Sequence, residues 1–133
     1  MKVVYVAHQL GSGADRDANR ASASEWAGWI ARTFNVAVSC DWIVLSGQWP
    51  ETPENRALGI AADLEMVSRA DEVWCVGPRM SPGMREEAMY ASRAGKTIRD
   101  FTGIANRNSI KGYLRLTMDA GAFSALVREQ EAA

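Results

Sequence analysis

The sequence predicts an α/β fold in which helices cover both faces of a parallel β-sheet. Two observations support this prediction. Short apolar segments rich in β-branched residues alternate along the chain with longer segments of helical periodicity. The segment at residues 71–76 is nearly continuous in apolar side chains, as expected for a strand that is buried on both faces. The length of 133 residues is enough for a substantial core, and residues 1–133 are expected to form a single domain.

The periodicity of each segment gives the order of the elements. From the N-terminus we expect a strand at 2–8, a polar loop at 9–17, a helix at 18–34, a strand at 36–40, a helix from Thr52 to about 69, a strand at 71–76, a helix from Ser81 to about 95 and a strand at 96–101. Residues 103–116 are mixed, with a loop at 106–108, and a last helix is expected at 118–129. Right-handed crossovers then predict a flavodoxin- or Rossmann-like doubly wound sheet of four to five strands, in the order 2-1-3-4 and with three α/β/α layers.

Residues 41–50 allow two interpretations. They extend the second strand, or they form a loop that lays Trp42 and Trp49 over the site. Exposed tryptophans can stack on a nucleobase, although packing inside the protein is the more common use of this residue.

Composition and charge exclude several classes of function. The formal net charge is −1 and the basic residues are scattered, so binding to a nucleic-acid polymer is not expected. A single histidine with no close Cys/His grouping argues against a metal site, and we expect neither a metal nor a cofactor. Cys40 and Cys75 are expected to be buried thiols rather than a disulfide. No apolar segment approaches the roughly 20 residues of a membrane helix and no targeting segment is visible, so a cytoplasmic protein is expected.

The helix that follows the third strand begins with features that favour an anion. Ser81 is a good N-cap, and Pro82 fits the first helical position, where the missing N–H costs nothing. Free N–H groups and the positive end of the helix dipole meet at this point. On a period of about 3.6 residues per turn, Glu86 points toward water. Glu87 instead lies at the border of the face that packs on the sheet, where burial can shift its pKa.

The segment at residues 81–91 reads SPGMREEAMYA and resembles the signature of the nucleoside 2-deoxyribosyltransferase-like superfamily. The resemblance implies that Glu87 is the nucleophile of a reaction at an N-glycosidic bond. It also implies that Tyr5, in the first strand, orients this carboxylate, and that Asp63 contacts the substrate and assists proton transfer. Four short motifs occur in the same order as in the superfamily, all between residues 1 and 101. The pattern is closest to uncharacterised members, so membership alone does not define the reaction.

The identity of residue 81 bears on the substrate. The deoxyribosyltransferases carry an aspartate there, whereas the nucleoside 5′-monophosphate N-glycosidases of the superfamily carry a serine that contacts the phosphate. The resemblance therefore implies cleavage of a nucleoside or (deoxy)nucleoside 5′-monophosphate, with water or another base as the acceptor. The expected substrate-binding residues are His8, Gly11, Ser12, Arg79, Ser81, Gly83 and Met84. The loop after the first strand lacks the arginine of the phosphate-dependent relatives, and Arg16 or Arg20 is the nearest replacement.

Each of these side chains also has a structural interpretation. Ser81 caps a helix, Tyr5 fits a core aromatic, and Asp63 fits a surface residue paired with Arg56 or Arg69. Two other functions stay open as well. One is a non-catalytic nucleotide-binding or sensing module, because fold alone does not establish activity. The other is an N-glycosidase that acts on an NAD-like dinucleotide. In every case the partner is a small-molecule nucleoside or nucleotide rather than a membrane, and the resemblance implies a homo-oligomer of at least two chains.

Overall fold

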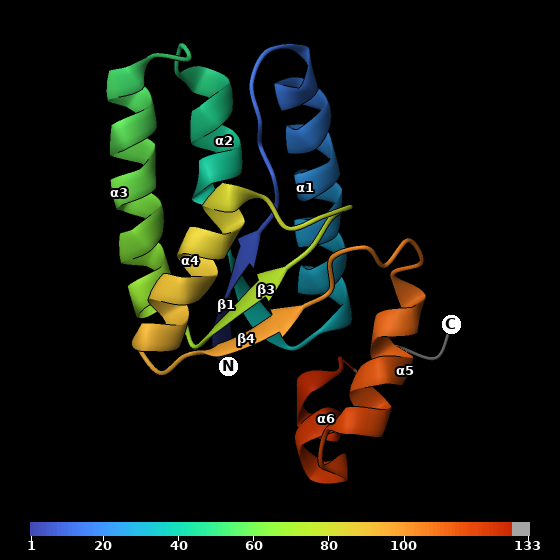
Figure 1. The fold of residues 1–133 in the computed structure, drawn as a ribbon. Coiled ribbons are helices and arrows are strands. Elements are labelled where there is room, and N and C mark those ends of the chain that lie inside the picture. Colours follow the sequence, from blue (N-terminus) through green and yellow to red (C-terminus); the bar gives the residue numbers. More distant parts are fainter. Residues whose placement is uncertain (129–133) are drawn as a thin grey trace.

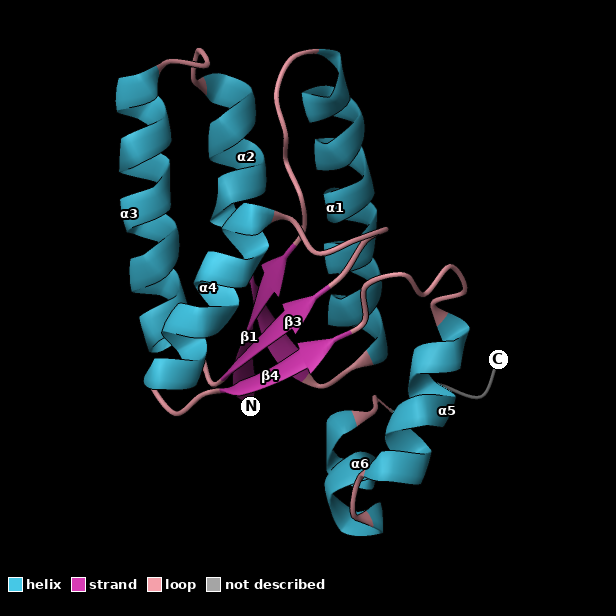
Figure 2. Cartoon of the chain, in the orientation of Figure 1, coloured by secondary structure: helices cyan, strands magenta, loops and turns pink. Residues whose placement is uncertain are grey.

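The computed structural model describes residues 1–128 and shows a parallel sheet between two layers of helices (Figure 1 and Figure 2). The strands are β1 (Lys2–Ala7), β2 (Val36–Ser39), β3 (Glu72–Cys75) and β4 (Thr97–Asp100), in the order β2-β1-β3-β4. The helices are α1 (Ala14–Thr33), α2 (Asp41–Gln48), α3 (Pro53–Arg69), α4 (Pro82–Arg93), α5 (Asn108–Thr117) and α6 (Ala120–Leu126). The predicted fold class and strand order are confirmed. No helix in the described part of the chain is both long and apolar enough to cross a membrane.

Alternate residues of β1 point into two separate cores. Val4 and Val6 pack on the side of α1, α5 and α6, whereas Tyr5 and Ala7 face the side of α3 and α4. On the α1 side, edge-to-face aromatic pairs connect Trp26, Trp29, Phe34, Trp74, Phe101 and Tyr113. Burial on both faces explains why the central strands are apolar at nearly every position.

Residues 41–50 contain helix α2, so neither interpretation of this segment was right. The indole of Trp42 is buried, and its Nε1 donates to the carbonyl of Val6 at 3.0 Å. The pairing of β1 with β2 ends at Ser39, so the Val6 carbonyl on that side of β1 has no strand to bond with. Trp42 takes the place of the missing strand and satisfies a buried carbonyl group.

Arg16 and Arg20 attach α2 to α1. Arg16 Nη2 donates to the carbonyl of Ser46 at 3.1 Å, and Arg20 Nε donates to that of Ile43 at 3.1 Å. The Arg20 guanidinium also lies against Gly47, where a Cβ atom would overlap it. Both arginines are thus engaged in holding α2, which argues against either one as the replacement for the phosphate-binding arginine.

The remaining differences from the expected elements lie at helix ends and in the C-terminal part. α1 begins at Ala14, directly after Gly13 with its positive φ of 63°, and acidic residues suit its first turn. Residues 103–116, expected to be mixed, contain most of α5, and the last helix is the short α6. Residues 1–128 form four strands, and Phe34 and Val127 make only an isolated antiparallel bridge. Residue 129, the expected end of the last helix, lies outside the described residues.

A buried carboxylate at the amino end of β3 binds side chains from β1 and β4. The Glu72 side chain is 3% exposed and accepts hydrogen bonds from Lys2 Nζ at 2.9 Å, Trp74 Nε1 at 2.9 Å and Arg99 Nε at 2.8 Å. Burial opposes ionisation, but these three donors outweigh it and hold the pKa of Glu72 below its usual value. Ligands of such sheets bind at the opposite, carboxyl edge, so this cluster has a structural role.

Candidate active site

The structure brings Tyr5, Asp63 and Glu87 together on the α3–α4 side of the sheet. Tyr5 is 2% exposed in the middle of β1, and its hydroxyl group is near enough to the carboxyl group of Glu87, from α4, to lower the pKa of that group. Asp63, from α3, is close enough for its charge to act on both other groups. Glu86 is exposed, so only one of the two adjacent glutamates faces this cluster. Arg69, one of the expected partners of Asp63, instead pairs with Glu65.

Burial shifts the titration of all three groups. The pKa of Glu87 is raised to about 7, chiefly by burial; the hydrogen bond from Tyr5 offsets part of this, and the charges of Asp63 and Glu86 add to it. Burial raises the pKa of Asp63 to about 6. Burial, followed by the charges of the two carboxylates, also raises the pKa of Tyr5, which therefore stays protonated and can donate. Two carboxyl groups that titrate near neutral pH suit a nucleophile and a proton donor.

Two buried side-chain oxygen atoms among the described residues have no hydrogen-bond partner. They are Oε2 of Glu87 and Oγ of Ser39. Buried polar atoms in native proteins are nearly always paired, and an unpaired one costs about 1–3 kcal/mol of desolvation free energy. Oε2 of Glu87 is therefore buried without a protein partner, which leaves it able to accept a hydrogen bond from a ligand.

Helix α4 begins with Ser81 as its N-cap, as expected. The Ser81 Oγ accepts from the Met84 N–H at 3.2 Å, and the Ser81 N–H donates to the Met84 Sδ at 3.4 Å. Met84 is 1% exposed and packs in the same core as Tyr5, whereas Gly83 is exposed in the first turn. The capping bond uses Ser81 as an acceptor, so its O–H group is still able to donate to a ligand.

His8 and Arg79 lie where the ends of β1 and β3 meet. His8 is 5% exposed, and its ring packs against Gly77, which has a φ of 100° and where a Cβ would lie 2.7 Å from the ring. Burial lowers the pKa of His8; its Nδ1 donates to the Gln9 carbonyl at 2.6 Å and its neutral Nε2 accepts from the Ser22 hydroxyl at 3.0 Å. Arg79 Nε donates to Gln9 Oε1 at 3.0 Å, which links the two loops at this edge.

Gly11 and Ser12 are exposed in the loop between β1 and α1. This loop rises from the carboxyl edge of the sheet to the start of α1 (Figure 1). Asn19, in α1, donates from its Nδ2 to the carbonyl of Leu10 at 2.9 Å, and this hydrogen bond attaches the loop to α1. Among the expected site residues, Gly11 and Ser12 are thus more exposed than the half-buried carboxyl groups of Asp63 and Glu87.

No group of three His, Cys, Asp or Glu side chains within residues 1–128 is arranged to hold a metal ion. The two cysteines are free thiols, with Cys75 buried and Cys40 half-buried. Burial raises the pKa of both, that of Cys75 to about 12. Both thiols therefore stay protonated at neutral pH and behave as small apolar side chains, as expected.

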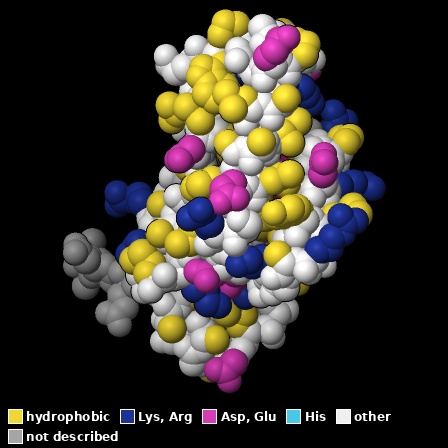
Figure 3. Space-filling view, turned by 90° about the vertical axis from the view of Figure 1, so that its left-hand side faces the viewer, with side chains coloured by type: hydrophobic (Ala, Val, Ile, Leu, Met, Phe, Trp, Pro, Cys, Tyr) yellow, Lys and Arg dark blue, Asp and Glu magenta, His cyan; other side chains and the backbone are white. Residues whose placement is uncertain are grey.

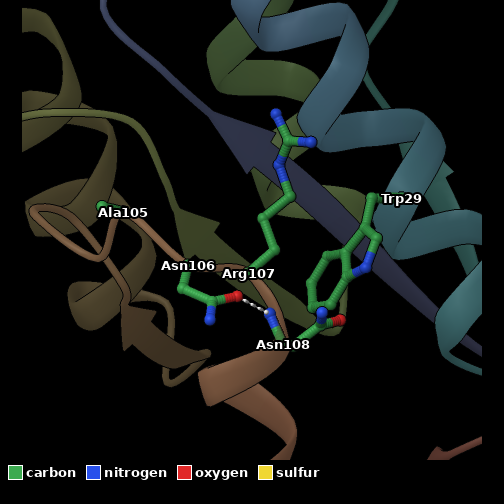
Figure 4. Close-up of a pocket in the computed structure, with 5 residues that line it drawn as sticks. All are labelled: Trp29, Ala105, Asn106, Arg107 and Asn108. Atoms are coloured by element: carbon green, nitrogen blue, oxygen red, sulfur yellow. Dashed lines mark hydrogen bonds between the residues drawn. The ribbon is translucent and has the colours of Figure 1, made fainter.

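A surface hollow of about 580 Å³ lies away from the cluster (Figure 4). It is lined by Trp29, Ala105, Asn106, Arg107 and Asn108. The Arg107 guanidinium lies 4.9 Å from the centre of the Trp26 ring and pairs with Glu25. Trp29 packs on the core of the α1 side, so this hollow and Glu87 are on opposite faces of the sheet.

Sequence reasoning missed Ser39 and the hydrogen bond between Gln9 Nε2 and Asn19 Oδ1, at 3.2 Å. Val36 and Val38 pack on the α1 side, so the alternation of β2 turns Ser39 toward the layer of Tyr5. That alternation was visible in the sequence. The absence of a hydrogen-bond partner was not, because it depends on packing between separate elements.

Comparisons with known proteins agree with the fold. A family model described as "Domain of unknown function (DUF7768)" matches residues 2–101. Among solved structures, a 2-deoxyribosyltransferase from the psychrotolerant bacterium Bacillus psychrosaccharolyticus is similar, with a TM-score of 0.53 and 17% identity over 91% of this chain and 95% of that chain. No curated protein matches the sequence. At this level of identity, the likeness shows a shared fold.

Proposed function

The chain belongs to the DUF7768 family of domains of unknown function, and we propose that it cleaves the N-glycosidic bond of a nucleoside or (deoxy)nucleoside 5′-monophosphate. One observation supports this most strongly: the half-buried carboxyl group of Glu87 has a buried oxygen without a partner and lies near Tyr5 and the carboxyl group of Asp63. The fold shared with a 2-deoxyribosyltransferase supports a reaction of the glycosyl-transfer type.

In the proposed reaction, departure of the base builds positive charge on the sugar. The carboxylate of Glu87 attacks the anomeric carbon, the bond to the base breaks, and its electron pair leaves with the base. Asp63 donates the proton that the leaving base accepts. Tyr5 holds the carboxylate in position through its donated hydrogen bond. Water then releases the sugar in a hydrolysis, or another base does so in a transfer.

Chromatography of free base, after incubation with nucleosides, their 5′-monophosphates and NAD, tests this proposal. Base release from a nucleoside or its monophosphate is expected for the wild type. Calorimetric titration with the same compounds separates the alternatives. Binding without base release identifies a sensing module. Release of nicotinamide from NAD identifies an NAD-like dinucleotide as the substrate. A protein that neither binds nor cleaves any of these compounds contradicts the proposal.

We expect a 5′-monophosphate to be preferred over the free nucleoside by tenfold or more. A phosphate at the start of α4 meets the N–H of Gly83 and the O–H of Ser81, because the N–H groups of Ser81, Met84 and Arg85 are already bonded and Pro82 has none. Arg79 lies in the preceding loop. A charge-assisted hydrogen bond contributes about 1.5–3 kcal/mol, which corresponds to roughly tenfold or more in affinity. Side-by-side turnover of a deoxynucleoside and its 5′-monophosphate measures the preference.

Ser81→Asp is the matched variant for this prediction. Aspartate keeps a good helix cap but places a negative charge where the phosphate is expected to bind. The variant should lose the preference for the monophosphate and keep the circular-dichroism spectrum of the wild type. Equal use of both substrates by the wild type contradicts the phosphate contact and leaves the glycosidic proposal standing.

We also propose that the protein is a homo-oligomer, associated through α3 and α4. Leu58 and Ile60 on α3, and Met89 and Tyr90 on α4, are exposed apolar side chains. Figure 3 shows hydrophobic side chains between basic side chains (Lys or Arg) and carboxylates on the face that contains α3. Sedimentation velocity at micromolar concentration should show a dimer or larger species, and Leu58→Glu should shift it toward the monomer. A fully active monomer excludes this proposal.

A further inference from the structure

Ser39 is a buried polar side chain that the proposed reaction does not use. It is 5% exposed at the carboxyl end of β2, and its Oγ has no hydrogen-bond partner. Burying a hydroxyl group without a partner is unfavourable, and each such group in a native structure calls for a reason. Ligands of this type of sheet bind at the carboxyl ends of the strands, which is where Ser39 lies.

The register of the sheet places Ser39 beside Tyr5. The two residues are paired positions of β2 and β1, and paired residues of neighbouring strands lie about 4.8 Å apart and point to the same face. Tyr5 in turn interacts with the carboxyl group of Glu87. Ser39 is therefore the strand neighbour of Tyr5, and the two unpaired buried oxygens, of Ser39 and Glu87, lie on the same side of the sheet.

We propose that Ser39 is a substrate-contacting residue whose hydroxyl group hydrogen-bonds a hydroxyl group of the substrate's pentose. The proposal rests on the proposed function, since it takes Glu87 as the group that attacks the sugar. A pentose surrounds its anomeric carbon with hydroxyl groups, and a serine hydroxyl can donate to such a group or accept from it. The carboxyl groups of Glu87 and Asp63 lie in the same layer and would repel a phosphate bound at Ser39. A neutral hydroxyl group of the substrate therefore fits this position better than an anion.

The proposal makes a specific prediction about stability. Ser39→Ala removes a buried oxygen that has no partner, so it breaks no hydrogen bond and removes a desolvation penalty. The variant should unfold at the same urea concentration as the wild type, or at a higher one. A lower midpoint shows that the hydroxyl supports the fold and overturns the assignment.

Binding is tested by a cycle that combines a change in the protein with a change in the ligand. Calorimetry measures the affinity of adenosine 5′-monophosphate and of its 2′-deoxy and 3′-deoxy analogues, with the guanosine, cytidine and uridine series in parallel. The titrations use Glu87→Gln protein, which prevents turnover. Ser39→Ala is added to this background in one arm, and Ser24→Ala, an exposed serine of α1, is added in the control arm.

With Ser39 intact, removal of the contacted sugar hydroxyl is expected to weaken binding about tenfold, the effect of one hydrogen bond. In the Ser39→Ala protein the same removal should change nothing, while the Ser24→Ala control should behave like the intact protein. An equal loss with and without Ser39 overturns this assignment and leaves the proposed function standing. Absence of binding by every nucleotide, together with absence of base release by the wild type, overturns both.

Discussion

Replacement of Glu87 by glutamine is expected to abolish base release and, at pH 8, to make the folded protein more stable. An amide is not a nucleophile, and removal of a catalytic nucleophile lowers turnover by about 10⁴-fold or more. The gain in stability arises because the wild-type protein buries an ionised carboxylate beside Asp63, whereas the amide carries no charge to desolvate. Free base measured by chromatography and urea unfolding at pH 8 report the two effects.

The pH dependence of stability gives a second measure of Glu87. Its pKa is about 7 in the folded protein against an ordinary value of 4.5, so the folded state binds this proton more tightly than the unfolded chain. The stability that this proton contributes is fully present below pH 4.5 and is lost as the pH rises through 7, by roughly 3 kcal/mol. Asp63, with its raised pKa, acts in the same direction.

Glu86→Gln is the matched control, because Glu86 is the exposed neighbour on the same helix. It should retain base release and the decline of stability with rising pH, whereas Glu87→Gln should flatten that decline. If Glu86→Gln is the inactive variant, the assignment of the inward-facing glutamate as the nucleophile is wrong.

Replacement of Glu72 by alanine is expected to destabilise the protein by about 3–5 kcal/mol, the usual effect of removing one partner of a buried ion pair. The change leaves the buried indole N–H of Trp74 without an acceptor and the Arg99 guanidinium, whose side chain is 21% exposed, without its carboxylate. Lys2 is 60% exposed and can turn to water. Urea unfolding at pH 7 measures the loss.

Acid should act on Glu72 in the opposite sense to Glu87. Because the pKa of Glu72 is lowered in the folded state, its contribution is present above the unfolded pKa of 4.5 and is lost as the pH falls through the folded value. Glu65→Ala serves as the control, since Glu65 forms an exposed pair with Arg69 on α3. Such pairs contribute about 0.3–0.5 kcal/mol. A loss for Glu72→Ala no larger than that of the control would show that the buried cluster is dispensable.

Most of the fold could be predicted because its signals are local. The Ser81–Pro82 start of α4 and the different environments of Glu86 and Glu87 follow from capping chemistry and the helical period alone. Helix α2 could not be predicted in this way. Hydrogen bonds between α2 and distant residues hold this helix. Trp42 donates to the carbonyl of Val6 in β1, and the carbonyl of Ile43 accepts from Arg20 in α1, so no local sequence pattern contains these contacts.

The candidate site was visible in the sequence to a smaller extent. Tyr5, Asp63 and Glu87 were grouped only through a resemblance to known proteins, since nothing local connects three elements so far apart in the chain. Arg16 and Arg20 had the charge that a phosphate needs, yet their partners are backbone carbonyls of α2. The oxygens of Ser39 and Glu87 are unpaired because no donor from another element lies within hydrogen-bonding distance, and only the packed structure can show this.

β1 is made first during synthesis, yet it lies between β2 and β3 in the finished sheet. Its pairing with β2 requires only the first 39 residues, whereas Lys2 and its partner Glu72 are 70 positions apart. At about 5–20 residues per second, a ribosome needs several seconds to make the intervening chain. During that time one edge of β1 has no partner and offers a template for pairing with other chains. A chaperone that covers short apolar strands is therefore expected to bind the nascent chain before β3 emerges and to release it afterwards.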